Sequence, residues 1–121
     1  MTIRILHVDD EPDIREIVGL ALELDPRFEV VAAPSGAEGL ERLDEGGFNL
    51  VLLDMMMPEM DGPATFAAMR ERSMGNVPVV FMTARAQAEQ SEKLIALDAV
   101  GVIAKPFDPL TLASELEAFL P

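Results

Sequence analysis

The sequence predicts an α/β fold: a doubly wound sheet of five parallel strands with helices on both faces. Two observations lead to this prediction. Five short runs rich in Val, Ile and Leu are typical of strands covered on both faces, and they alternate with helical patterns along the chain. Such a (βα)5 alternation has right-handed crossovers, and its common strand order is 2-1-3-4-5.

Each strand is expected at one of these apolar runs. The runs are Ile3–Val8, Phe28–Ala32, Asn49–Leu53, Pro78–Met82 and Gly101–Ala104. Between the first two runs, apolar residues recur from Ile14 at the i, i+3, i+4, i+7 and i+8 positions of one helix face. Pro12 suits the first turn of this helix, and Pro26 closes it.

The second and third helices are indicated by their end residues. Ser35, with Glu38 three residues later, fits a capping box, and this helix is expected to run to the Gly46–Gly47 pair. The third helix is expected from Pro63 to Arg72. The apolar residues of the two helices are Leu40, Leu43, Phe66, Ala67 and Met69.

Two more helices complete the predicted fold. The fourth, roughly Ala86 to Asp98, is mostly polar before Leu94. The fifth is expected to begin at Asp108 and Pro109. The apolar residues that it would bury are Leu112, Leu116, Phe119 and Leu120.

Length and composition limit the class of protein. A chain of 121 residues, half of them hydrophobic, suits one domain over residues 1–121. The net charge of -13, from nine basic and 22 acidic residues, argues against direct binding to nucleic acid or to anionic membranes. No cysteine is present, and no apolar run approaches the ~20 residues of a membrane span. We therefore expect a soluble, cytoplasmic protein.

Polar side chains gather at the carboxyl ends of the predicted strands. Asp9 and Asp10 end the first strand, Asp54 ends the third, Thr83 follows the fourth and Lys105 follows the fifth. In the order 2-1-3-4-5 these four strands are contiguous. Doubly wound sheets bind ligands at this edge, so the sequence predicts one shallow pocket with three carboxylates, a hydroxyl and an ammonium.

Three close carboxylates require a counter-charge. Two unit charges ~4 Å apart repel by roughly 4 kcal/mol at an effective dielectric constant of 20. Oxygen ligands favour Mg²⁺, with Mn²⁺ as a substitute, and Mg²⁺ in such sites keeps positions open for phosphate oxygens. With Lys105 and Thr83 nearby, the pocket suits a phosphoryl group. An Asp can act as the nucleophile that accepts it.

Four segments carry a family resemblance, which extends from the first strand to the fifth helix. VDDEP, LLDMMMPEMDG, MTA and the IAKPF segment resemble the receiver domain of two-component response regulators, a flavodoxin-like fold, in particular the stand-alone receivers of chemotaxis. The resemblance implies a phosphorylation-switched signalling module rather than an enzyme with its own substrate. The donor would be a phosphohistidine of a sensor histidine kinase or a histidine phosphotransfer protein, or a small molecule such as acetyl phosphate.

The resemblance also implies a role for each residue of the pocket. Asp54 would be the phosphoacceptor, and Asp10 and Asp54 would bind Mg²⁺ directly, with Asp9 acting through water. The backbone carbonyl of Met56 would complete the protein ligands of the ion. Thr83 and Lys105 would contact the phosphoryl oxygens, and the Lys105–Pro106 peptide bond would be cis.

One residue departs from the pattern of the family, at the position of its usual aromatic switch. Receivers usually carry Tyr or Phe three residues before the lysine, but here the residue is Val102, and the chain has no Tyr or Trp. We therefore hypothesise that the switch runs through a backbone shift of the loop after the fourth strand and the fourth helix.

The chain ends after the fifth helix, as expected of a stand-alone receiver or of one cut from a larger regulator. The partner surface implied by the family, formed by helix four, strand five and helix five, would include Arg85, Lys93 and Val102.

Plainer interpretations exist for single residues. Asp9 and Asp10 could lie in the capping region of the first helix, and Thr83 could be a helix N-cap before Ala84. His7, inside the first strand, is interpreted as a structural histidine. The four methionines near Asp54 are interpreted as flexible packing rather than as ligands of soft copper; they are Met55, Met56, Met57 and Met60.

Three other functions compete with a phosphorylation switch. A phosphatase of the haloacid-dehalogenase type would need an Asp two residues after the nucleophile, where this chain has Met56. A flavodoxin-like electron carrier would need a Ser/Thr/Gly-rich phosphate loop after the first strand, where Asp9 and Asp10 stand. A receiver that binds its partner constitutively, without phosphorylation, remains the main alternative.

Overall fold

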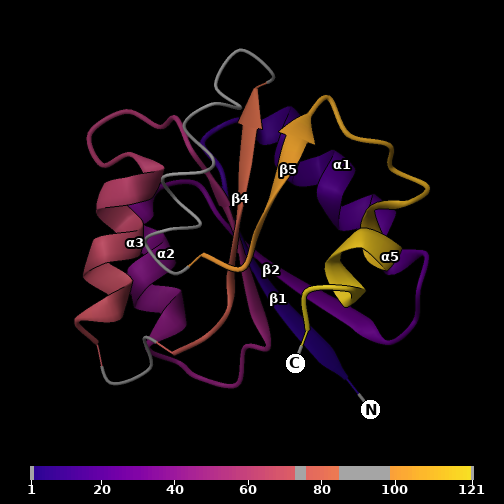
Figure 1. Ribbon diagram of the computed structural model, residues 1–121, viewed down its shortest axis with the longest axis horizontal. Coiled ribbons are helices and arrows are strands. Elements are labelled where there is room, and N and C mark those ends of the chain that lie inside the picture. Colours follow the sequence, from indigo (N-terminus) through magenta and orange to yellow (C-terminus); the bar gives the residue numbers. More distant parts are fainter. Residues whose placement is uncertain (1, 73–75, 85–98, 121) are drawn as a thin grey trace.

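The computed structural model describes residues 2–72, 76–84 and 99–120. Five parallel strands form one sheet in the order β2-β1-β3-β4-β5, so the predicted fold class and strand order are confirmed (Figure 1). The strands are β1 (Ile3–Val8), β2 (Phe28–Ala33), β3 (Leu50–Asp54), β4 (Val79–Ala84) and β5 (Gly101–Lys105). The described helices are α1 (Pro12–Glu23), α2 (Gly36–Leu43), α3 (Gly62–Arg70) and α5 (Leu112–Glu117).

The helices cover both faces of the sheet and bury two separate cores. Helices α2 and α3 lie on one face, and α1 and α5 lie on the other (Figure 1). Because side chains alternate along a strand, Leu6 of β1 joins the core under α2 and α3, whereas Ile5 joins the core under α1 and α5. Both residues are fully buried. None of the described helices is long and apolar enough to cross a membrane.

Four strands, β2 to β5, extend farther at their carboxyl ends than the apolar runs indicated. Strand β4 includes Thr83 and Ala84, which pair with Ala104 and Lys105 of β5. Strand β3 likewise ends on Asp54, opposite Met82. The expectation that Thr83 and Lys105 follow their strands is therefore wrong by one or two residues. The reason is that the backbone ladder does not depend on the polarity of side chains, so it continues past the apolar run.

The first three helices begin close to where their sequence signals predicted. Pro12 is the first residue of α1. Ser35 is the N-cap of α2, and its side chain accepts a hydrogen bond from the Glu38 amide at 3.2 Å. Helix α3 begins at Gly62 and ends at Arg70, short of the predicted Arg72. The predicted helix over residues 86–98 lies outside the described residues.

The start of the fifth helix differs from the prediction. Asp108 precedes a turn rather than a helix: its carboxylate accepts a hydrogen bond from the Leu110 amide at 2.9 Å, and its carbonyl accepts one from the Thr111 amide. Helix α5 therefore begins only at Leu112. Leu112 and Leu116 are fully buried, as predicted. Phe119 and Leu120 follow the helix and are only half-buried, contrary to the prediction.

Gly62 allows the loop after β3 to lie against the end of that strand. A Cβ at this position would be 2.5 Å from the backbone oxygen of Asp54 and 2.8 Å from the Cα of Met55. The Gly62 amide donates a hydrogen bond to the Met55 carbonyl at 2.9 Å, which holds the two segments at this distance. These backbone atoms leave no room for a side chain at this position.

We expect Gly62→Ala to lower the free energy of unfolding by about 1–3 kcal/mol, because the new Cβ forces the backbone of β3 and α3 apart. Urea denaturation measures the change. Gly19→Ala is the matched control, since a Cβ at Gly19 in α1 meets nothing within 4 Å. Its substitution should raise stability by up to ~1 kcal/mol through helix propensity. Equal effects of the two substitutions would contradict the steric explanation.

Candidate functional site

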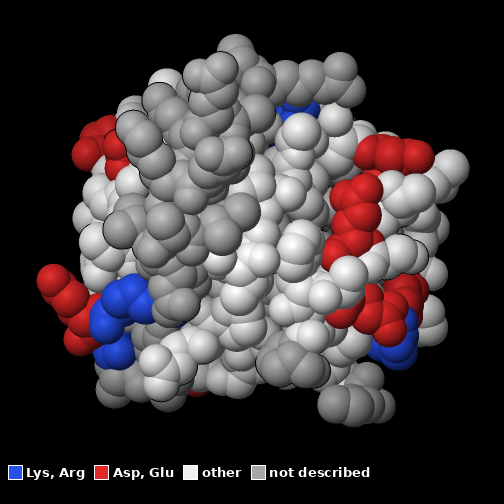
Figure 2. Space-filling model, in the orientation of Figure 1, with Lys and Arg blue, Asp and Glu red and all other residues white. Residues whose placement is uncertain are grey.

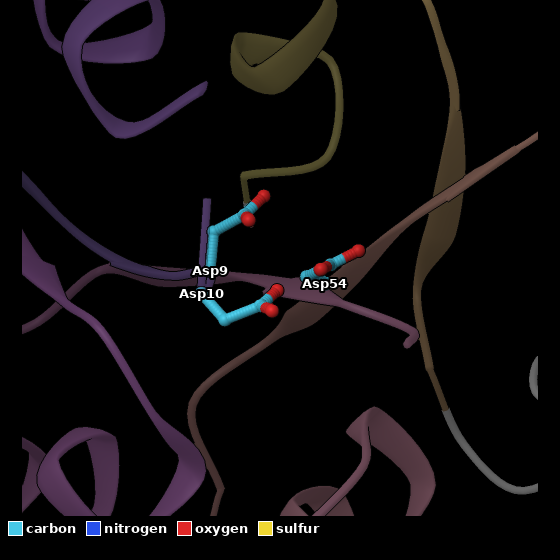
Figure 3. Close-up of side chains that lie close together, drawn as sticks. All are labelled: Asp9, Asp10 and Asp54. Carbon is cyan, nitrogen blue, oxygen red and sulfur yellow. The ribbon is translucent and has the colours of Figure 1, made fainter. Parts of the chain in front are cut away.

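Three carboxylates meet at the carboxyl ends of two neighbouring strands. Asp9 and Asp10 directly follow β1, and Asp54 is the last residue of β3, which pairs with β1 (Figure 3). One carboxylate oxygen of each residue lies within 4.8 Å of those of the other two. Asp9 and Asp54 are buried, and Asp10 is half-buried. The acidic cluster predicted from the sequence is therefore present.

The loop between β1 and α1 holds Asp9 in place through several hydrogen bonds. The Asp9 amide donates to the Ala33 carbonyl at 3.1 Å. Its carboxylate oxygen Oδ1 accepts the Glu11 amide at 2.9 Å, and its carbonyl accepts Arg15 Nη1 at 2.8 Å. Glu11 is the N-cap residue of α1, so Asp9 also supports the start of the helix. The two interpretations of Asp9, as a site residue and as part of the capping region, are compatible.

Lys105 connects the two buried carboxylates. Its Nζ donates to Asp9 Oδ2 at 3.0 Å and to Asp54 Oδ1 at 3.1 Å. The lysine is the last residue of β5, and its side chain is only 17 % exposed. It is therefore not a free loop charge. The Lys105–Pro106 peptide bond is cis, as the resemblance implied.

Thr83 and Met56 flank the acidic cluster. Thr83 is buried in β4 and directly follows Met82, the register partner of Asp54. The alternative of a helix N-cap before Ala84 is wrong, since Ala84 is a strand residue. The Met56 side chain is 62 % exposed. Flexible packing therefore describes Met55, Met57 and Met60, which contact the core under α2 and α3, but not Met56.

Two neighbours of the cluster were not predicted as site residues. Arg15 reaches back from α1 to the Asp9 carbonyl, and no sequence signal indicated this contact. His7 is fully buried in β1, with its Nε2 3.7 Å from Asp9 Oδ2. Its position two residues before Asp9 could have indicated this, because residues i and i+2 of a strand share a face. At 3.7 Å the imidazole is a neighbour of Asp9 rather than a hydrogen-bonded partner.

The buried charged groups of the site shift one another's pKa values. Burial, followed by repulsion from the Asp9 carboxylate, raises the pKa of Asp54 to about 6 in spite of Lys105. Burial alone would also raise the pKa of Asp9, but His7, the Glu11 amide and Lys105 outweigh it, so this pKa lies below its usual range. Burial opposes the charge of Lys105, yet the two carboxylates raise its pKa. Asp9 and Lys105 are therefore the more firmly ionised pair, and Asp54 is the group that titrates.

The donor set fits a small, hard cation. Three carboxylates offer only oxygen ligands, which Mg²⁺ and Mn²⁺ prefer, and no thiolate is available in this chain. Asp10 is half-buried, and among the described residues its carboxylate forms no ion pair, since Lys105 pairs with Asp9 and Asp54 instead. A cation would relieve the repulsion that raises the pKa of Asp54.

We expect Asp54→Asn to stabilise the metal-free protein at pH 7.5 by roughly 1–3 kcal/mol. A folded-state pKa above the unfolded value of 3.8 means that folding favours the neutral acid. The stability contributed by this group is fully present below pH 4 and is lost as the pH rises through about 6. Urea denaturation in EDTA at pH 4 and pH 7.5 measures the effect. A gain of equal size at both pH values would contradict it.

Mg²⁺ should raise the melting temperature of the native protein. At 100 times the dissociation constant, the added stability is ~2.7 kcal/mol. Asp10→Asn should abolish most of this response, because it removes one of the three carboxylates. Asp13→Asn, at an exposed acidic residue in the first turn of α1, is the matched control and should keep the response. An equal response of the Asp10 variant and the native protein would exclude this metal site.

Comparison with known proteins places the chain in a family. Residues 5–117 match the model of the response regulator receiver domain. Among curated relatives, the CpxR homolog of Haemophilus influenzae, a transcriptional regulatory protein, is 37% identical over 97% of this chain and 50% of its own length. The transcriptional regulatory protein SrrA of Staphylococcus aureus is 33% identical over 99% of this chain and 48% of its own length. The chain thus spans about half the length of these relatives.

Solved structures agree with the family assignment. The chemotaxis response regulator CheY4 of Vibrio cholerae superposes with a TM-score of 0.89 at 31% identity, covering 99% of this chain and 100% of its own. NtrX of Brucella abortus also superposes with a TM-score of 0.89, at 30% identity, but only 27% of its chain is covered. From the match of the family model, the relatives and the shared fold, the chain belongs to the response regulator receiver domains.

Proposed function

We propose that residues 1–121 form one receiver domain that is switched by phosphorylation of Asp54 and turns over no separate substrate. Lys105 carries this proposal, because its ammonium lies between the Asp54 carboxylate and a second buried carboxylate, Asp9. An ammonium in this place can neutralise a phosphoryl group added to Asp54. The family membership of the chain supports the same function.

The transfer would be a direct displacement at phosphorus. One oxygen of the ionised Asp54 carboxylate forms the new bond to phosphorus while the P–N bond of the donor phosphohistidine breaks. The electron pair of that bond stays on the imidazole nitrogen. With acetyl phosphate as donor, a P–O bond breaks instead and the pair leaves with acetate. The protein contributes mainly position and charge, as is general for phosphoryl transfer.

Each residue near Asp54 has a part in this proposal. Asp10 and Asp54 would hold Mg²⁺, or Mn²⁺ as a substitute, with the Met56 carbonyl, and Asp9 would act through water. The bound ion would neutralise negative charge that develops on the transferred group. Lys105 and the Thr83 hydroxyl would contact the phosphoryl oxygens. The burial of Asp9, Asp54 and Thr83 supports this arrangement, since charge interactions are stronger away from water.

The donor would be a sensor histidine kinase or a histidine phosphotransfer protein in the cytoplasm. The downstream partner would bind the surface of helix four, β5 and α5, of which residues 85–98 lie outside the described structure. The described part of this surface contains a cavity of 440 Å³ between β5 and α5. Its walls include Val102, Phe107 and Phe119, and its edge carries the acidic residues Asp108 and Glu115. Figure 2 shows acidic side chains gathered on the side of the molecule that carries α5.

A receiver that binds its partner constitutively is the second candidate, and Val102 favours it. This residue is half-buried and packs against the core under α2 and α3. A valine in this place has no ring that could turn between two positions. The proposed alternative route, a backbone shift after β4, falls on residues outside the described structure. Unchanged NMR signals from Thr83 to Val102 on phosphorylation would refute that route.

We expect the native protein to gain the mass of one phosphoryl group when it is incubated with acetyl phosphate and Mg²⁺. Intact-protein mass spectrometry measures the gain. Asp54→Asn and a reaction without Mg²⁺ should show none, and the exposed acid variant Asp13→Asn should behave as the native protein does. If neither acetyl phosphate nor a phosphorylated kinase modifies the native protein, constitutive binding becomes the better account.

A further inference from the structure

His7 is a buried polar side chain whose ring nitrogens are unpaired among the described residues. The residue lies in the middle of β1 with no exposed surface. Neither Nδ1 nor Nε2 has a hydrogen-bond partner within the described residues. An unpaired buried polar group destabilises the folded state, whereas an apolar residue at the same position would not. A buried histidine that is unpaired among the described residues calls for a physical explanation, and one explanation is a partner in another state of the protein.

The nearest acceptor to His7 is an oxygen that Lys105 already occupies. Nε2 of His7 lies 3.7 Å from Asp9 Oδ2. The same oxygen accepts the hydrogen bond from Lys105 Nζ at 3.0 Å, and the other oxygen, Oδ1, accepts the Glu11 amide. Two donors thus face one acceptor, and only Lys105 is within hydrogen-bond distance. A shift of less than about 1 Å would bring His7 within that distance.

The imidazole of His7 can supply the donor for such a bond. A neutral imidazole carries one N–H, which can be placed on Nε2, and a protonated imidazole carries an N–H on each ring nitrogen. His7 can therefore donate to Asp9 Oδ2 in either form.

Phosphorylation of Asp54 would change the position of Lys105. Phosphoryl oxygens would lie beyond the Asp54 oxygen that accepts from Nζ at 3.1 Å, so contact with them would draw the ammonium away from Asp9. Asp9 is fully buried, and its Oδ2 would then lose its only hydrogen bond from the described residues. We propose that His7 is a positioning residue that donates its Nε2–H to Asp9 Oδ2 when Lys105 moves to the phosphoryl group. This inference rests on the proposed phosphorylation of Asp54.

NMR of the ¹⁵N-labelled full chain tests the inference, with beryllofluoride plus Mg²⁺ as the phosphoryl mimic. The chain has one histidine, so its imidazole signals have a unique assignment. We expect the Nε2 and Nε2–H signals to shift on addition of beryllofluoride, and the proton to exchange more slowly with water. Mg²⁺ alone should leave them unchanged. Unchanged imidazole signals together with a shifted Lys105 Nζ signal would overturn the proposal.

A fluorine spectrum of the same sample separates this failure from that of the proposed function. Bound beryllofluoride has its own ¹⁹F signal, and Asp54→Asn is the control that should lack it. If the native protein shows no bound signal, then the pocket does not take a phosphoryl group. The proposed function would then fail, and the role of His7 would fail with it.

Two substitutions distinguish positioning from a general structural role. His7→Leu fills an interior strand position with an apolar residue, so the metal-free protein should be at least as stable as the native one. Its affinity for Mg²⁺ should stay within about twofold, but its affinity for beryllofluoride should fall about tenfold, as for a lost hydrogen bond to a charged group. His7→Gln keeps an N–H donor and should lose less. Equal losses for both ligands, or no loss for beryllofluoride, would refute the proposal.

Discussion

The ammonium of Lys105 between Asp9 and Asp54 is the interaction on which the site depends. It joins the last residue of β5 to the ends of β1 and β3, across strands that are distant in the sequence. Without a positive charge there, two buried carboxylates would face each other, and the pKa of both would be higher. The strand order matters to function for this reason, because it brings these three strand ends to the same place.

The surroundings of Asp54 keep that residue less firmly ionised than its neighbours. Among the described residues, the Asp9 carboxylate accepts hydrogen bonds from Glu11 and Lys105, whereas that of Asp54 accepts one from Lys105 and is repelled by the charge of Asp9. Even with Lys105 present, the carboxylates of the pocket therefore repel one another. This repulsion favours any ligand that adds positive charge, and in the proposed function it would link metal binding to the reactivity of the Asp54 carboxylate.

Much of the fold and the identity of the acidic cluster could be predicted from the sequence. Apolar runs indicated the strands to within two residues, and the strand order placed Asp9, Asp10 and Asp54 together. The start of α5 could not be predicted as well, because Asp108 followed by Pro109 suits a turn as much as a helix start. The contact of Arg15 with Asp9 depends on how α1 packs beside β1, and no local pattern predicts it. The proximity of His7 to Asp9, by contrast, could have been predicted from their spacing of two residues.

The division of the interior into two cores has a consequence for how the domain can vary. Side chains such as Leu6 and Ile5 are neighbours in the chain but lie on opposite faces of the sheet. Substitutions that share no neighbours usually change stability additively. Each face can therefore be repacked with little effect on the other. At the carboxyl edge of the sheet, where Asp9, Asp54 and Lys105 meet, double-mutant cycles should instead report strong coupling across strands.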